Sequence, residues 1–235
     1  MTDHVNASLS LEADRALLGR TSTAEKVAEI LRTRIIEGAF QPGERLAEDK
    51  IVKALSISRN TLREAFRLLT HARLLTHEMN RGVFVRSLTT DDVRDLYRVR
   101  RMIECSVVSA ITAPPAGLAQ VEAAVAEGER AERAGAWREL GTANMHFHQA
   151  LTGLANSPRL DEMMQQIIAE LRLAFHVMND PERFHGPYLS RNQAILIDLR
   201  RGDGPSASEK LSDYLTVAET QLLAGFATRS PSPAP

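Results

Sequence analysis

The chain has little of what stabilises secreted or membrane-spanning proteins. Its 235 residues include one cysteine, Cys105, so a disulfide within the chain is impossible. The sequence shows neither a secretory signal segment nor an apolar run of about 18 residues. We therefore expect a cytoplasmic protein that does not contact a membrane. Cys105 lies in the apolar helical stretch RRMIECSVVSAI, where an inert buried thiol and a redox switch are the alternatives.

Sequence motifs that mark several enzyme classes are also missing. The chain has no HExxH segment, no Ser-His-Asp order and no glycine-rich phosphate loop. Its net charge of −1 gives no indication of nucleic-acid binding. The charge is unevenly placed, however, because residues 20–86 contain 13 Lys and Arg against 8 Asp and Glu, which leaves −6 for the rest. A partner with negative charge is therefore expected at the basic part of the chain.

Residues 42–86 predict two short helices, a tight turn and a hairpin, which is the order of a winged helix-turn-helix. A further helix precedes them and ends at the loop from Gly38 to Gly43. Apolar residues three or four apart place one face of each helix against a small core. These residues are Val27, Ile30, Leu31 and Ile35 in the first helix, Ile51, Val52 and Leu55 in the second, and Leu62, Ala65, Phe66 and Leu69 in the third.

The third predicted helix also has a polar face equipped for reading DNA in the major groove. Arg59 and Arg63 can each hydrogen-bond guanine, and Asn60 can pair with adenine. Ser58, which can cap the helix, and Thr61 suit phosphate together with the helix dipole. For Arg59 and Arg63 alone, a merely solvated helix face is the alternative. The surrounding pattern favours the DNA-reading interpretation.

A hairpin follows the third helix. Residues 74–78 and 83–86 read as two strands, joined across residues 79–82 with Gly82 at the tight position. We expect Arg81 at the tip to meet the DNA backbone or the minor groove, although a lone arginine in a turn is commonly just solvated. Together these elements predict three helices and a two-stranded wing.

The segments PGERL, SISRNTLREAFRLL and NRGVFV resemble the DNA-binding domain of the GntR superfamily of bacterial transcription regulators, over residues 22–86. One position departs from the resemblance, because FadR-like relatives often have arginine where this chain has Asp49. The neighbouring Lys50 replaces that contact only in part, since it is a flexible point charge. The resemblance and the helix pattern together predict the DNA-contacting residues Lys50, Ser58, Arg59, Asn60, Thr61, Arg63, Arg81 and Gly82.

After residue 86 the sequence predicts only helices. A linker and cap at residues 88–91 precede a long amphipathic helix with acidic residues at its start. Further helices are expected at about 116–134, 136–154, 158–179, 187–201 and 205–226, separated mostly by Gly, Pro or Asn. The fold class is therefore mainly α: an N-terminal winged helix-turn-helix followed by an all-α helical bundle of about six helices.

The segments LYRVRRMIE, NMHFHQALTGLANSPRL, RNQAILIDLRRGD and KLSDYL resemble the FCD effector-binding domain of the FadR subfamily, over residues 90–222. The resemblance implies a homodimer that binds a palindromic DNA operator and a small-molecule effector, frequently an organic acid. The expected organisation is a flexible extension (1–20), the DNA-binding domain (21–87), the effector-binding and dimerisation domain (88–227) and a disordered tail (228–235).

Many FCD domains hold a divalent metal with one Asp and three His residues. The resemblance places Asn144, His148, Asn192 and Tyr214 at those positions, with the spacings kept. Two amides and a phenol are weak neutral ligands, so we expect no metal and no cofactor. The same side chains are good hydrogen-bonding groups, and we expect them to contact the effector directly. A mutually satisfied polar network without a ligand is the alternative.

Arg100 matches an arginine of the family's first FCD helix and is the candidate to bind a carboxylate of the effector. An ion pair with Glu104, one turn further on, is its alternative role. Three other histidines can serve only an altered metal site. His146 points to nearly the opposite side of its helix from the mapped histidine, and His176 and His185 lie on other segments.

Two functions are compatible with these observations. The first is a ligand-responsive DNA-binding transcription regulator, a repressor released by its effector. The second is a helical metal-dependent enzyme with the N-terminal domain as an oligomerisation module, because His146, His148, Asp161 and Glu162 cluster in the sequence. The enzyme has no recognisable motif to support it, so we expect a regulator without catalytic residues.

Overall fold

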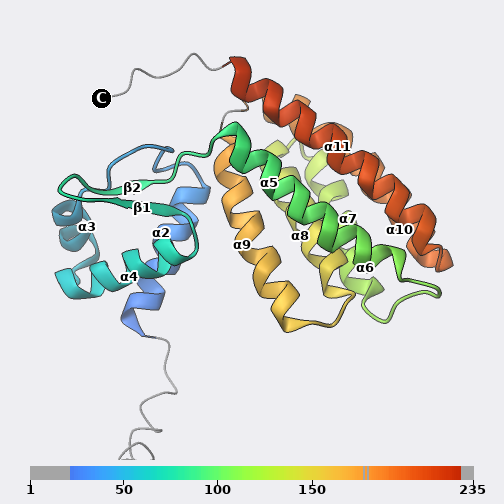
Figure 1. The fold of residues 1–235 in the computed structure, drawn as a ribbon, viewed down its shortest axis with the longest axis horizontal. Coiled ribbons are helices and arrows are strands. Elements are labelled where there is room, and N and C mark those ends of the chain that lie inside the picture. Colours follow the sequence, from blue (N-terminus) through green and yellow to red (C-terminus); the bar gives the residue numbers. More distant parts are fainter. Residues whose placement is uncertain (1–21, 177, 179, 229–235) are drawn as a thin grey trace, which may run out of the picture.

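Two helical parts lie side by side in a computed structural model, which describes residues 22–176, 178 and 180–228 (Figure 1). A winged helix-turn-helix, called the reader below, occupies one end, and an all-α bundle occupies the other. This arrangement confirms the predicted fold class. The expected extension at residues 1–20 and tail at residues 228–235 lie outside the described residues, except that residue 228 ends the last helix.

The reader has three helices and a two-stranded antiparallel sheet: α2 (Thr23–Ile36), α3 (Glu48–Leu55), α4 (Arg59–His71), β1 (Leu75–Glu78) and β2 (Gly82–Val85). A capping box between Ser22 and Glu25 begins α2. The predicted apolar residues of the three helices are buried or half-buried, with one exception. Ile30 is 46% exposed, because the buried stripe of α2 runs through Ala28 instead and leaves Ile30 beside it.

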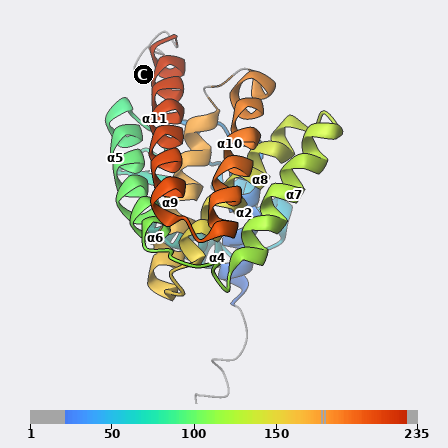
Figure 2. The same ribbon diagram turned by 90° about the vertical axis from the view of Figure 1, so that its right-hand side faces the viewer.

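The bundle begins with α5, a π-helical turn and α6, which follow one another without a break, and continues with five longer helices (Figure 2). The bounds are α5 (Thr90–Arg100), the π-helical turn (Arg101–Cys105), α6 (Ser106–Ser109), α7 (Leu118–Arg133), α8 (Trp137–Gly153), α9 (Pro158–Phe175), α10 (Pro181–Arg201) and α11 (Gly204–Thr228). A capping box between Thr89 and Asp92 starts α5, as the linker pattern predicts. No helix in the described part of the chain has the length and apolar character that a membrane crossing requires.

The sequence predicts a new helix at residue 187, but α10 begins at Pro181 and runs through Pro187. Asp180 caps its start by accepting a hydrogen bond from the Arg183 amide at 3.0 Å. A proline inside a helix lacks the N–H that would bond the carbonyl one turn earlier. Here Gln221 Nε2 on α11 donates to that carbonyl, the oxygen of Arg183, at 3.3 Å. The neighbouring helix replaces the missing hydrogen bond, so the predicted break is wrong.

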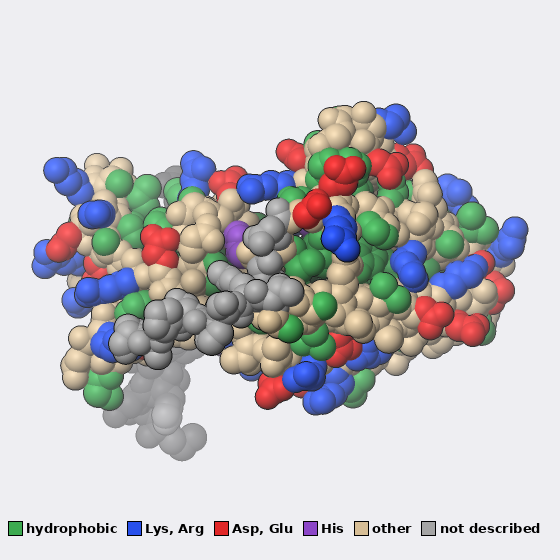
Figure 3. Space-filling model, turned by 90° about the horizontal axis from the view of Figure 1, so that it is seen from above, with side chains coloured by type: hydrophobic (Ala, Val, Ile, Leu, Met, Phe, Trp, Pro, Cys, Tyr) green, Lys and Arg blue, Asp and Glu red, His purple; other side chains and the backbone are tan. Residues whose placement is uncertain are grey.

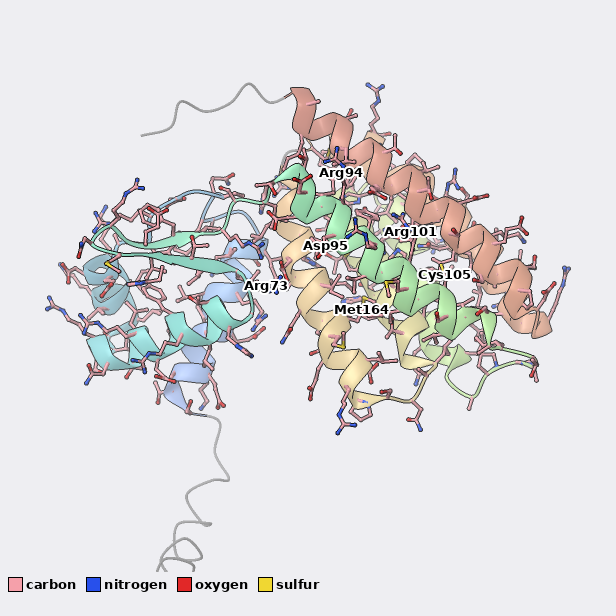
Figure 4. All side chains as sticks on the ribbon, in the orientation of Figure 1. Arg73, Arg94, Asp95, Arg101, Cys105 and Met164 are labelled. Atoms are coloured by element: carbon pink, nitrogen blue, oxygen red, sulfur yellow. The ribbon has the colours of Figure 1, made fainter. Side chains whose placement is uncertain are left out.

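Helix α9 joins the bundle to the reader. Leu173 on α9 is buried within the apolar cluster of the reader. Arg86, just after β2, donates to Glu170 from Nη1 and to Asp92 from Nη2, both at 2.6 Å. The Glu170 side chain is 6% exposed, and Arg73, labelled in Figure 4, approaches it to 3.9 Å from the reader. We call Arg86, Glu170 and Asp92 the clasp, because they tie the wing to α9 and α5 together.

Removal of the Arg86 side chain should destabilise the protein far more than removal of a surface arginine. Arg86→Ala leaves the buried carboxylate of Glu170 without its closest partner, which should cost about 3–5 kcal/mol of unfolding free energy. The matched control is Arg94→Ala on the exposed face of α5, where the pair with Asp91 is worth at most about 1 kcal/mol.

Urea unfolding of both variants measures the difference. Burial raises the pKa of the Glu170 carboxyl despite its arginine neighbours. The loss caused by Arg86→Ala should therefore shrink as the pH falls and Glu170 takes up a proton. Equal losses in the two variants would contradict a stabilising clasp.

Candidate nucleic-acid interface and effector site

The face of α4 that points away from the reader's core carries most of the predicted DNA-contacting residues. Arg59, Asn60 and Arg63 are exposed, and Ser58 and Thr61 lie at the start of the helix. The Ser58 hydroxyl accepts a hydrogen bond from the Thr61 amide at 3.0 Å, so its structural role is to cap α4. Seen from above, Lys and Arg side chains are prominent at the outer end of the reader (Figure 3). The structure thus brings these residues to one exposed end of the molecule.

The start of α3 places two carboxylates beside the arginines of α4. Arg59 Nη2 donates to Asp49 Oδ1 at 3.0 Å, and Arg63 Nε lies 3.9 Å from Glu48 Oε2. Arg59, Asp49 and Arg63 are largely exposed and Glu48 is half-buried, so these pairs are weak and salt-sensitive. Lys50, also exposed, lies next to Asp49 on α3. DNA that approaches α4 must therefore compete with Asp49 for the Arg59 guanidinium.

The wing places Arg81 and Gly82 at the hairpin turn, as predicted. Arg81 Nη1 pairs with Glu78 Oε2 at 2.5 Å, and its guanidinium lies 5.5 Å from the centre of the Phe84 ring. Gly82 has a φ of +112°, a conformation that disfavours other residues, and a Cβ there would lie 3.1 Å from Arg45 Nε.

Arg45 is an exposed cation beside the wing that the predicted set omits. Its position in the segment PGERL is the only sequence signal, because a loop residue has no helical periodicity.

The four residues mapped onto the family's metal site come together in the bundle. They come from three helices: Asn144 and His148 from α8, Asn192 from α10 and Tyr214 from α11. Asn192 Nδ2 and the Tyr214 hydroxyl both donate to Asn144 Oδ1, at 2.8 and 2.9 Å. The rings of His148 and Tyr214 meet edge to face, with their centres 4.9 Å apart. All four side chains are buried.

Glu104, on the π-helical turn, connects Arg100 to this group. Its carboxylate accepts a hydrogen bond from Arg100 Nε at 2.8 Å and one from His148 Nδ1 at 2.6 Å. Arg100, Glu104 and His148 are each at most 1% exposed. The alternative role of Arg100, an ion pair with Glu104, is therefore present. Sequence reasoning missed Glu104 as a site residue, because its contact with His148 joins positions 44 residues apart.

Burial and neighbouring charges set the protonation of this polar cluster, by which we mean Arg100, Glu104, Asn144, His148, Asn192 and Tyr214. Burial opposes ionisation of Glu104, but Arg100 and His148 hold the pKa of its carboxyl below its usual value. Burial lowers the pKa of His148 and raises that of Tyr214 well above its usual value. At neutral pH the polar cluster thus contains one cation, one anion, a neutral imidazole and a neutral phenol.

The donor chemistry of Asn144, Asn192 and Tyr214, at three of the four mapped positions, does not fit the metal that the family resemblance implies. Asn144 Oδ1 already accepts two hydrogen bonds, and the Tyr214 phenol keeps its proton. Neutral amides and a phenol supply no anionic ligand for a divalent cation. Within the described residues, no group of three or more His, Cys, Asp and Glu side chains is arranged to hold a metal ion.

The three other histidines lie away from the polar cluster. His146 is exposed, and its Nδ1 lies 2.8 Å from Glu127 Oε2, which agrees with the predicted outward direction. His176 Nε2 donates to the Ile35 carbonyl at 3.3 Å, at the joint between bundle and reader. His185 is buried against aromatic rings, and burial lowers its pKa to about 4. The structure does not bring these side chains together.

Three buried polar atoms of the polar cluster have no hydrogen-bond partner among the described residues. They are Nη2 of Arg100, Nε2 of His148 and Oδ1 of Asn192. Buried polar groups in native proteins are nearly always paired with protein, water or ligand atoms. Within the described residues, the side chains of the polar cluster therefore do not satisfy all of one another's hydrogen-bonding groups.

The fold, a winged helix-turn-helix reader joined to an all-α domain, is that of a class of transcription regulators. The family model described as "Bacterial regulatory proteins, gntR family" matches residues 23–85, and the model "FCD domain" matches residues 95–216. The chain belongs to the GntR family of bacterial regulatory proteins and contains an FCD domain.

Individual relatives agree with this assignment. A solved structure of a transcriptional regulator GntR from Rhodococcus sp. RHA1 is 46% identical, with a TM-score of 0.83, and covers 87% of this chain and 99% of that one. The HTH-type transcriptional regulator YdhC of Bacillus subtilis is 31% identical over 58% of this chain and 62% of that protein. The gluconate operon transcriptional repressor of Bacillus licheniformis is 37% identical over 38% of this chain and 37% of that protein. The chain thus spans less than two thirds of the length of these two curated relatives.

Neutralisation of Asp49 should strengthen DNA binding. Asp49→Asn removes the carboxylate that competes for Arg59, so affinity for duplex DNA should rise roughly two- to fivefold, the range expected for an exposed ion pair. Asp91→Asn on α5 is the matched control, since Asp91 pairs with an arginine of the bundle and should leave affinity unchanged. Fluorescence anisotropy with a labelled duplex at fixed salt measures both; unchanged or weaker binding by Asp49→Asn would refute the competition.

The two buried histidines should make the protein less stable in mild acid. The pKa of His185 falls from 6.5 unfolded to about 4 folded, and that of His148 is lowered too. Below about pH 6.5 the unfolded chain binds protons that the folded chain does not, so stability is lost as pH falls, by up to about 1.4 kcal/mol per pH unit for each group. His185→Phe should reduce this slope in urea unfolding between pH 6.5 and about 4. An unchanged slope would show that His185 does not contribute.

Proposed function

We propose that this protein is a DNA-binding transcriptional repressor that binds a palindromic operator as a homodimer and is released by a small-molecule effector in its bundle. The observation that carries the proposal is the exposed set Arg59, Asn60 and Arg63 on α4, next to a wing with a cation at its tip. The relative that is named a transcriptional repressor supports repression rather than activation. A DNA-bound function places the protein in the bacterial cytoplasm.

In the proposed complex, α4 lies in the major groove. Arg59 and Arg63 reach guanine edges, and Asn60 reaches adenine. Lys50, Thr61 and Arg81 bind the phosphate backbone, and the Ser58 cap and Gly82 turn hold the elements that carry them. A pair of such readers related by a twofold axis requires a palindromic site, since each reader then meets the same half-site.

In the proposed effector site, the ligand contacts the polar cluster directly, without a metal. The support comes from the three unpaired buried atoms and from the poor fit of the donor set to a cation. A buried atom without a protein partner can also hydrogen-bond an ordered water, which a ligand then displaces. Arg100, Asn144, His148, Asn192 and Tyr214 are the proposed contact residues, with Glu104 holding two of them in place.

A structural route connects the two sites. Helix α5 carries Asp92 of the clasp at its start and Arg100 of the polar cluster at its end. A ligand that hydrogen-bonds Arg100 or His148 alters the contacts of these side chains with Glu104, which lies on the π-helical turn directly after α5. Because Arg86 of the reader binds Asp92, displacement of α5 alters the position of the wing. We therefore place effector control of the reader in α5 and the clasp.

The test is a gel shift with promoter DNA and with random duplex of equal length. Arg59→Ala combined with Arg63→Ala should abolish the sequence-specific shift, because it removes both base-reading guanidinium groups. For the parent protein, the observed affinity should fall on the order of a hundredfold between about 50 and 200 mM salt.

The matched control combines Arg94→Ala with Arg98→Ala, two exposed and ion-paired arginines at i and i+4 on α5 of the bundle. This control should bind as the parent does. If the α4 variant still distinguishes promoter from random DNA, or if affinity is insensitive to salt, the proposed reader is wrong.

A further inference from the structure

The polar cluster specifies which kind of effector fits it, and this inference rests on the proposed function. Its three unpaired atoms are a guanidinium nitrogen, an imidazole nitrogen and an amide oxygen. Each must be matched by a ligand atom of the opposite hydrogen-bonding type, because a buried polar atom without a partner is destabilising. The protonation state and orientation of the three side chains therefore decide what the ligand must offer.

Glu104 fixes the role of His148. The Glu104 carboxylate can only accept hydrogen bonds, so the 2.6 Å contact requires a proton on His148 Nδ1. Complete burial favours the neutral imidazole, which then has its lone pair on Nε2. His148 Nε2 is thus an acceptor, and it needs an O–H or N–H donor from the ligand.

Asn144 fixes the role of Asn192 in the same way. Asn144 Oδ1 accepts from both Asn192 Nδ2 and the Tyr214 hydroxyl. Since the amide nitrogen of Asn192 faces Asn144, its oxygen is the atom without a partner. Asn192 Oδ1 is a second acceptor and needs a second donor from the ligand.

Arg100 supplies the donor among the three buried atoms of the polar cluster that have no partner within the described residues. Its Nε binds Glu104, which leaves Nη2 to meet an acceptor of the ligand. The positive charge of Arg100 is already cancelled by Glu104, at 2.8 Å and away from solvent. An anionic ligand would bring an uncompensated charge into this buried site, which is strongly unfavourable.

We infer that the effector is a small neutral polyhydroxylated molecule, of the sugar-alcohol class, rather than an organic acid or a metal chelate. Each hydroxyl both donates and accepts, so one such molecule can offer the acceptor that Arg100 Nη2 needs and the donors that His148 Nε2 and Asn192 Oδ1 need, once the surrounding side chains move apart to admit it. Glu104 is the positioning residue for this choice, because it sets the histidine tautomer and cancels the arginine charge. Tyrosine rings at 97, 188 and 214 adjoin the polar groups, which is typical of ligand pockets.

Two probes that differ in one group test the charge selection. D-Sorbitol and D-gluconate share the same hydroxylated carbon chain, but one ends in CH₂OH and the other in a carboxylate. Isothermal titration calorimetry of the full chain at millimolar probe concentrations should show binding of sorbitol at least on the order of tenfold tighter than of gluconate. Hexanoate and ZnCl₂ should not bind.

Glu104→Gln should reverse the preference, since it leaves the Arg100 charge without its partner and makes a carboxylate the better ligand. A loss of stability alone would weaken both probes equally, so the ratio of the two affinities is the decisive readout. Glu219→Gln is the matched control. Glu219 pairs with Arg101, the first residue of the π-helical turn, at 2.6 Å, and neither residue belongs to the polar cluster. Its sorbitol-to-gluconate ratio should equal that of the parent.

A second measurement covers the case in which Glu104→Gln does not fold. The ¹⁵N shifts of the parent's His148 should show a protonated Nδ1 and an unprotonated Nε2, and sorbitol should shift Nε2. A protonated Nε2, tighter binding of gluconate or of zinc by the parent, or no binding of sorbitol would each overturn the inference.

DNA binding is measured on the same preparation. If it persists while gluconate is preferred, the inference fails and the proposed function stands; if specific DNA binding is absent, the proposed function fails.

Discussion

The bundle depends on one buried carboxylate, Glu104, that serves two partners at once. It neutralises Arg100 and holds the Nδ1–H of His148, with all three side chains removed from solvent. An isolated charge in such a place is strongly destabilising, so none of the three has a stable alternative position without the others. The π-helical turn that carries Glu104 is a rare form of helix, of a kind that occurs frequently at functional sites. The interaction therefore accounts for both the shape of the first bundle helix and the chemistry of the polar cluster.

A second buried carboxylate, Glu170, holds the reader in the same manner. Arg86 reaches it from the wing and binds Asp92 with its other nitrogen, so the guanidinium spans α9, α5 and the reader. The capping box of α5 uses Asp92 as well, which ties the start of that helix to the joint. Since Arg100 lies at the other end of α5, the two buried carboxylates are mechanically connected through one rigid helix. In the proposed function, α5 is therefore the element through which a change at the polar cluster reaches the wing.

Much of this arrangement follows from the sequence, and the exceptions have local causes. Periodicity places the helices of the reader and the exposed face of α4 correctly, because both depend on contacts within one helix turn. The break expected at Pro187 does not occur, since a side chain from α11, Gln221, satisfies the carbonyl that proline leaves unpaired. The resemblance to the FCD domain brings Asn144, His148, Asn192 and Tyr214 into one prediction, and they do meet. The role of Glu104 cannot be predicted from the sequence, because it depends on how the π-helical turn faces α8.

With the proposed effector bound at the polar cluster, the site keeps the residue spacing of the family while its selectivity changes. A resident divalent cation would attract carboxylates through its charge, and small differences between acids would matter little. In this chain the fixed charges cancel within the pair of Arg100 and Glu104, so recognition depends on matching the donor and the two acceptors that have no partner. A ligand that misses one match leaves a buried polar atom unpaired, which costs about 1–3 kcal/mol, or roughly five- to a hundredfold in affinity. Selectivity of this kind rejects close analogues that lack one hydroxyl, which charge attraction alone does not achieve.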